Sequence, residues 1–149
     1  MRWLWLFGTL AACTAATHTP EIGDWTCTER SSPGALREFV AKSNVRFDGR
    51  NAIYDYEYSE TYGHRQIRMT LSVNRTYVRQ GRRVSSNVEA INITSIEVNG
   101  RDGLGTPHER WARGRFGAPL DAKVEFRGFD TFRLTTEKGY KIDCKRALP

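Results

Sequence analysis

The chain has 149 residues, and its 23 Lys and Arg against 17 Asp and Glu give a formal net charge of +6 at pH 7. This length accommodates one domain with a sizeable core and excludes two. The moderate basic excess is compatible with anionic neighbours such as lipid headgroups, peptidoglycan or lipopolysaccharide, although an arginine-rich solubilising surface explains it equally well.

The first twelve residues have the features of an export signal. Arg2 supplies a positive charge, residues 3–10 are mostly apolar, and small residues follow. The apolar run is too short to span a bilayer, which requires about 20 apolar residues. We therefore expect a signal peptide over residues 1–12, a flexible polar tether over 13–21 and a single β-rich domain over 22–149.

The run Leu10-Ala11-Ala12-Cys13 resembles the lipobox of bacterial lipoproteins. The resemblance implies that signal removal leaves Cys13 as the first residue, carrying diacylglycerol and an acyl chain such as palmitate, which together anchor the protein to a membrane. Thr14 stands where the inner-membrane retention signal of enteric bacteria has Asp, so the resemblance implies the outer membrane, facing the periplasm. Cleavage after Ala16, which would discard Cys13, is the alternative.

The other two cysteines, Cys27 and Cys144, lie near opposite ends of the expected domain. In the oxidising compartment that an export signal indicates, we expect them to form a disulfide, and two buried free thiols are the alternative. We expect no metal and no cofactor, because there is no CxxC, no HxxxH and no phosphate-binding glycine loop, and the three histidines are far apart in the sequence.

Apolar and polar residues alternate along most of the chain, which is typical of half-buried strands. In chain order, this alternation predicts strands around residues 25–27, 45–47, 54–58, 67–73, 88–98, 124–126, 132–134 and 140–144. Asp48-Gly49 predicts a hairpin turn. Cys27 and Cys144 both fall on the apolar face of their strands, as a disulfide between the first and last strands requires.

Thr106-Pro107-His108-Glu109 fits a capping box with proline at the first helical position. It predicts a helix of one or two turns that runs to about Arg113 and stops at Gly114. Residues 33–42 can be interpreted either as a second short helix or as a strand. The whole pattern predicts a mainly β fold, a compact antiparallel barrel or sandwich of about seven or eight strands with one or two short helices.

The start of the first strand, Gly23-Asp24-Trp25, is similar to the Gly-x-Trp opening of the lipocalin and related calycin barrels, in which the tryptophan plugs the closed end. The resemblance covers three residues and does not bring a ligand cavity with it. We expect a barrel interior that side chains fill.

Catalytic motifs are absent from the sequence, which contains no Gly-x-Ser-x-Gly elbow and no HExxH, so we do not expect an enzyme. Asp55 and Glu57 share one strand face, and we expect that face to be the solvated outer one. The alternating row Tyr54, Tyr56 and Tyr58 is expected to pack in the core rather than to form a carbohydrate platform.

The segment with the greatest binding potential interleaves guanidinium groups with large rings, at Arg110, Trp111, Arg113, Arg115 and Phe116. Such a segment is suited to an anionic ligand or a partner surface. The alternative is that the two rings anchor a short helix while the arginines remain in solvent.

Two classes of function remain at this point. The first is a membrane-anchored, non-catalytic module that binds an envelope protein, cell-wall material or an anionic lipid, with nucleic acid disfavoured by the export signal. The second is an inhibitor of a lysozyme-like or other hydrolase, because small β-barrel lipoproteins that inhibit c-type lysozymes are similar in size, anchor and disulfide. This chain lacks their Ser-Gly-x-x-Tyr segment and is basic, which favours the first class.

Overall fold

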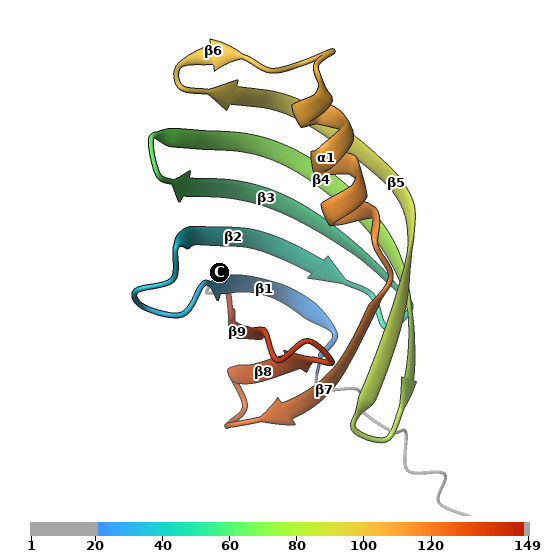
Figure 1. Cartoon of the computed structure of the whole chain (residues 1–149). Helices are drawn as coiled ribbons and strands as arrows, with labels where there is room; N and C mark the ends of the chain where they lie inside the picture. The colour runs from blue at the N-terminus through green and yellow to red at the C-terminus, as the bar shows by residue number, and fades with distance from the viewer. Residues whose placement is uncertain (1–20, 148–149) are drawn as a thin grey trace, which may run out of the picture.

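A computed structural model describes residues 21–147, which form a closed antiparallel barrel of eight strands with one short helix (Figure 1). A further two-residue strand, β6, pairs with the end of β5 outside the barrel. The elements are β1 (Gly23–Arg30), β2 (Arg37–Phe47), β3 (Asn51–Tyr62), β4 (Arg65–Gln80), β5 (Arg83–Val98), β6 (Arg101–Asp102), α1 (Pro107–Gly117), β7 (Leu120–Phe126), β8 (Thr131–Thr136) and β9 (Lys141–Arg146). The predicted barrel is confirmed.

The barrel closes between its first and last strands. β1 pairs antiparallel with β9, and Cys27 lies directly opposite Cys144 in the register. The two cysteines form a disulfide, with a sequence separation of 117, and both are buried. The predicted pairing and its strand-face parity are confirmed.

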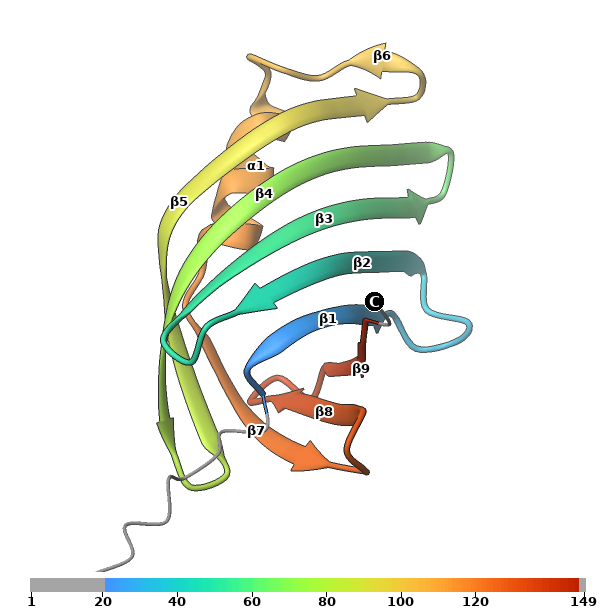
Figure 2. The same cartoon turned by 180° about the vertical axis from the view of Figure 1, so that it is seen from behind.

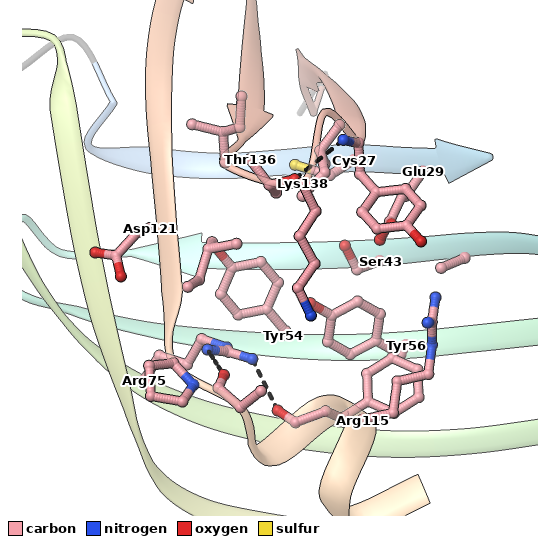
Figure 3. A pocket seen from close by; sticks show the side chains of 18 of the residues that line it. Cys27, Glu29, Ser43, Tyr54, Tyr56, Arg75, Arg115, Asp121, Thr136 and Lys138 are labelled. Carbon is pink, nitrogen blue, oxygen red and sulfur yellow. Dashed lines mark hydrogen bonds between the residues drawn. The ribbon is translucent and has the colours of Figure 1, made fainter. Parts of the chain in front are cut away.

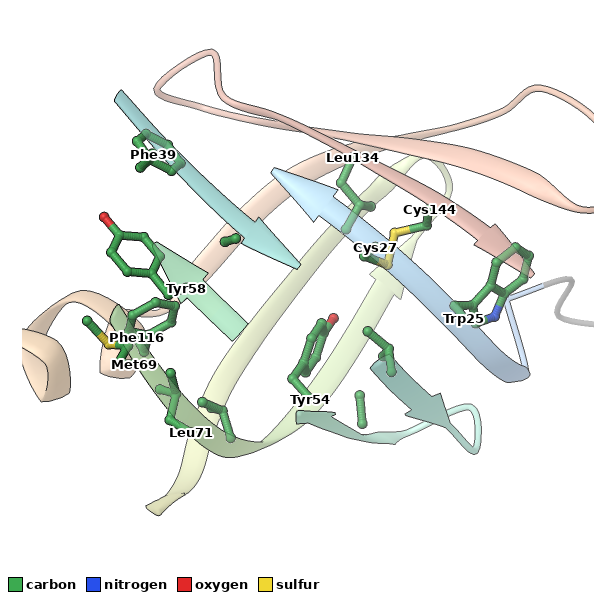
Figure 4. Packing of buried hydrophobic residues seen from close by; sticks show 14 of the residues in the cluster. Trp25, Cys27, Phe39, Tyr54, Tyr58, Met69, Leu71, Phe116, Leu134 and Cys144 are labelled. Carbon is green, nitrogen blue, oxygen red and sulfur yellow. A yellow bond between two sulfur atoms is a disulfide. The ribbon is translucent and has the colours of Figure 1, made fainter. Parts of the chain in front are cut away.

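Period-two alternation places one face of each strand in the core. On β4, Ile67, Met69, Leu71 and Val73 are all buried, while the residues between them are exposed or half-buried. β3 pairs with β4, and its Tyr54, Tyr56 and Tyr58 are buried or half-buried whereas Asp55 and Glu57 are exposed, as expected. The buried side chains form one continuous cluster that extends from Trp25 to Phe39 and Phe116 (Figure 4).

Two local expectations are corrected by the structure. Residues 37–47 form strand β2, so the interpretation of residues 33–42 as a helix is wrong, and α1 is the only helix of residues 21–147. Helix α1 also continues through Gly114 to Gly117. It continues because Phe116 packs on Tyr56 and Tyr58, and it ends where Ala118, which precedes Pro119, adopts an extended conformation.

The barrel wall is uneven in height. β4 and β5 have 16 residues each, whereas β8 and β9 have 6 each. β5 and β7 pair only over residues 83–86 and 120–123, and beyond that junction α1 lies against the tall wall formed by the long curved strands (Figures 1 and 2). The hairpin connections β2–β3, β4–β5 and β7–β8 lie at one end of the barrel, which we call the basal end, together with the start of β1. The other end is the upper end.

A candidate ligand cavity inside the barrel

The barrel interior is not filled by side chains, so that expectation is wrong. A cavity of about 270 Å³ lies between the inner faces of the strands, α1 and the β8–β9 turn (Figure 3). The cavity exists for two reasons. The inward residues of β2 at this level, Ala41 and Ser43, are small, and β8 and β9 are too short to form the upper part of the barrel wall on their side, so that helix α1 covers it. An eight-stranded barrel is just wide enough either to be filled or to hold one small ligand.

The polar groups of the cavity come from several elements. β1 contributes Glu29, β3 contributes Tyr54 and Tyr56, and α1 contributes Arg115. Lys138, an exposed residue of the β8–β9 turn, extends from that turn toward Tyr54 and Tyr56 in Figure 3. The remaining lining combines apolar residues with further polar and charged ones. Its apolar part includes Phe116, Leu134 and Ile142, and its polar part includes Ser43, Arg75, Asp121, Thr136 and Glu137.

Arg115 is the most distinctive of these groups. Its guanidinium carbon lies 4.8 Å from the ring centre of Phe39 and 5.2 Å from that of Tyr58. Its Nε is buried and has no hydrogen-bond partner among residues 21–147. Aromatic faces attract a cation but leave its N–H donors unused. Arg115 is therefore a cation at the cavity wall with hydrogen-bonding capacity that the protein does not saturate.

Three carboxylates line the cavity, and of these Glu29 is half-buried whereas Asp121 and Glu137 are exposed. Burial raises the pKa of Glu29, and the nearby charge of Arg115 offsets part of that rise. No ion-pair contact joins Glu29 to Arg115 within the described residues, although the two charges interact electrostatically. Burial also raises the pKa of Tyr56, so its hydroxyl is protonated at neutral pH and can donate or accept a hydrogen bond. Within residues 21–147, no hydrogen bond or ion pair joins the Glu29 carboxyl, the Arg115 guanidinium and the Tyr56 hydroxyl of this cavity to one another.

Arg75 lines the same cavity, but its hydrogen bonds hold the end of helix α1. Its side chain, on the inner face of β4, is buried and donates to the carbonyl oxygen of Phe116 at 2.8 Å and to that of Ala118 at 3.1 Å. These carbonyls lie at the end of α1, where backbone acceptors have no intrahelical donor and cations are favoured. Arg75 therefore fixes the end of the helix that carries Arg115.

The basal end of the interior is closed and apolar. Trp25 is 2% exposed, its Nε1 donates to the carbonyl of Glu21 at 2.6 Å, and Arg146 covers its ring at 4.4 Å. A second, smaller cavity of about 70 Å³ lies beside Trp25. Tyr54, Leu134 and Cys27 line both cavities, and the Tyr54 hydroxyl is hydrogen-bonded to that of Tyr77. These side chains form the floor of the larger cavity.

The candidate binding residues between Arg110 and Phe116 do not form one surface, because their side chains point to different parts of the molecule. Arg110 is exposed, and Arg113 pairs with Glu109 at 2.7 Å within the helix. Trp111 is half-buried, 6.1 Å from the ring of Tyr58, and Phe116 is buried. Both rings anchor the helix, as the alternative interpretation expected, but Arg115 lines the cavity instead of remaining in solvent.

Sequence reasoning missed Glu29 and Arg75, yet the signal for them was present. Glu29 continues the inward series Trp25, Cys27 on β1, and Arg75 continues the series from Ile67 to Val73 on β4. A charged residue at an inward position of a strand indicates either a buried network or a binding site.

Glu60 is a further inward acid, 2% exposed, and it belongs to a closed network at the upper end. It pairs with Arg37 at 2.7 Å and accepts a hydrogen bond from the Tyr58 hydroxyl at 2.5 Å. Burial opposes ionisation of Glu60, but these hydrogen bonds outweigh it and lower the pKa. Because its oxygens are already engaged, Glu60 is a structural group and not a ligand for the cavity.

Comparison of the chain with protein-family models and with curated proteins gives no match. In residues 21–147, no three or more His, Cys, Asp or Glu side chains are grouped so that they could hold a metal ion. The helix of this part of the chain is not long and apolar enough to cross a membrane.

Proposed function

We propose that the protein is an exported, lipid-anchored binding protein that takes a small ligand into its barrel, without catalysis. The single observation that carries this proposal is the cavity of about 270 Å³, in which Arg115 has an unsatisfied donor and faces Glu29 without an ion-pair contact. Binding sites for small molecules combine apolar lining with convergent polar groups, and this cavity contains both, with a larger polar share than is usual.

The lining also supports a class of ligand. Flat apolar surface is available from Tyr56 and Phe116, and Arg115 supplies a positive charge beside them. A guanidinium favours a carboxylate, sulfonate or phosphate, which it can contact through two donors. The proposed ligand therefore has a compact apolar or aromatic body and one anionic group, and it is small because the cavity is small.

The lipid anchor on Cys13 and the oxidising compartment outside the cytoplasm are parts of the same proposal. They are supported by the lipobox-like run that ends at Cys13 and by the disulfide between Cys27 and Cys144, a bond that persists in oxidising compartments. In this proposal the lipid holds the barrel at the periplasmic face of the outer membrane, and the cavity collects or carries a ligand there.

The proposal is tested by titrating the protein with anilinonaphthalene sulfonate, a fluorescent aromatic anion. We expect one saturable site, with binding weakened about 10- to 100-fold by Arg115→Gln, since a hydrogen bond to a charged group contributes about 1.5–3 kcal/mol. Arg110→Gln, on the same helix but exposed, is the matched control and should bind as the native protein does.

A cavity-filling variant checks the location of the site. Ser43→Leu places a larger side chain where the small β2 residue now lines the cavity, and it should abolish binding while the fold is retained. Equal binding by the native, Arg115→Gln and Ser43→Leu proteins would show that the probe binds elsewhere, and the proposal would fail.

A further inference from the structure

Exposed arginines gather at the turns of the basal end of the barrel. Arg50 lies in the β2–β3 turn, Arg82 lies in the β4–β5 turn with Arg83 next to it at the start of β5, and Arg127 follows β7; all four are exposed. The acidic side chains of these turns are Asp48 and Asp130. Asp48 accepts hydrogen bonds from the backbone of Arg50 and Asn51 and so closes its own turn.

The upper end has no such excess. In its turns, Lys138 stands next to Glu137, and Arg101 stands next to Asp102. The β1–β2 connection, residues 31–36, contains no charged residue. The arginines at the basal turns therefore outnumber the acidic residues of those turns, whereas the charged residues of the upper turns balance one another.

The described chain begins at that same basal end. Glu21 is buried there, where its carbonyl accepts from Trp25 and its carboxylate pairs with Arg79 of β4. Glu21 was expected to close the flexible tether, but it belongs to the folded domain. Glu21 is eight positions after Cys13, and eight steps of fully extended chain span at most about 29 Å.

We propose that the basal end is a docking face for an anionic membrane surface. A lipid on Cys13 would keep this end, and not the upper one, within reach of the headgroups, so the orientation rests on the anchor in the proposed function. Arginines near an anionic leaflet are attracted to it over about one Debye length, about 8 Å at physiological salt. Phe129, which follows Arg127 in the β7–β8 connection, is 99% exposed and can enter the interface. The β8–β9 turn, which lines the cavity, then lies at the end of the barrel away from the membrane.

The test uses the chain from residue 13 onward with Cys13→Ser, which lacks both the apolar signal and the site for the lipid, so that only the folded surface differs between variants. Binding is measured by co-sedimentation with vesicles of phosphatidylcholine, with and without phosphatidylglycerol. We expect binding to the anionic vesicles only, and loss of that binding at high salt. Each arginine near the surface contributes roughly a fivefold change in partitioning, so Arg82→Gln, Arg83→Gln and Arg127→Gln together should weaken binding roughly 100-fold.

A triple variant with the same net charge is the control. Arg30→Gln, Arg68→Gln and Arg101→Gln remove three exposed arginines from the upper end, and this protein should bind as before. Equal loss in the two triple variants, or no preference for anionic vesicles, would overturn the docking face. Mass spectrometry of the natural protein decides the anchor separately, because an unlipidated start downstream of Cys13 would refute the anchor and leave the vesicle result unaffected.

Discussion

Removal of the disulfide should lower the free energy of unfolding without changing the fold. The bond closes a loop with a sequence separation of 117, for which the chain-entropy model gives about 5 kcal/mol. The double variant Cys27→Ala and Cys144→Ala keeps the antiparallel pairing of β1 with β9, which includes the register pairs on both sides of the bond. The barrel should therefore still close. Because the unfolded chain without the cross-link has more conformations, folding then costs more conformational entropy.

The assay is equilibrium unfolding in urea, followed by circular dichroism. With a slope of about 2 kcal/mol per M, the midpoint should fall by about 2.5 M urea. Since both sulfurs are buried, a reductant should act on the native protein only after it unfolds. A double variant whose midpoint matches that of the native protein would refute the reasoning, because it would show that the cross-link does not destabilise the unfolded chain.

Three further predictions concern the cavity and the anchor. Arg75→Met leaves the carbonyls of Phe116 and Ala118 without their donor and should cost about 2–4 kcal/mol of unfolding free energy in the same urea assay; an unchanged midpoint would contradict its role at the helix end. Glu29→Gln should stabilise the protein at pH 7, because burial raises the pKa of Glu29 in the folded state and ionisation therefore favours unfolding as the pH rises through that pKa. The gain should vanish at about pH 3, where the carboxyl is protonated in both states, and a gain independent of pH would contradict this explanation. Cys13→Ser should release the protein from membranes in cell fractionation without lowering its urea midpoint, and persistent membrane association would count against the anchor.

The strands and the disulfide could be predicted from the sequence because both follow from alternation along the chain. Residues 67–73 show the period directly, and Cys27 and Cys144 share the inward parity of Trp25 and Ile142. Alternation gives no information on how far a strand continues. The sequence therefore did not show that a strand begins at Arg37, and the helix interpretation of residues 33–42 was wrong. Phe39, Ala41 and Ser43 are identified as inward positions only by the pairing of β2 with β1 and β3.

The cavity could not be predicted, because it depends on differences in strand length and side-chain volume between segments far apart in the sequence. Ala41 and Ser43 leave space only because short β8 and β9 stand opposite the long wall and α1 covers the gap. Arg115 was identified as a candidate, but for an outer surface. Its position at the cavity follows from the extension of α1 beyond Gly114, which Phe116 and Arg75 stabilise through tertiary contacts.

The occupation of the barrel by an anionic ligand next to Arg115 is tested most directly by nuclear magnetic resonance of arginine side chains. During titration with anilinonaphthalene sulfonate, the Nε–H signal of Arg115 should shift and saturate, and the signal of exposed Arg110 should stay in place. An Arg115 signal that does not move while the probe binds would contradict the account.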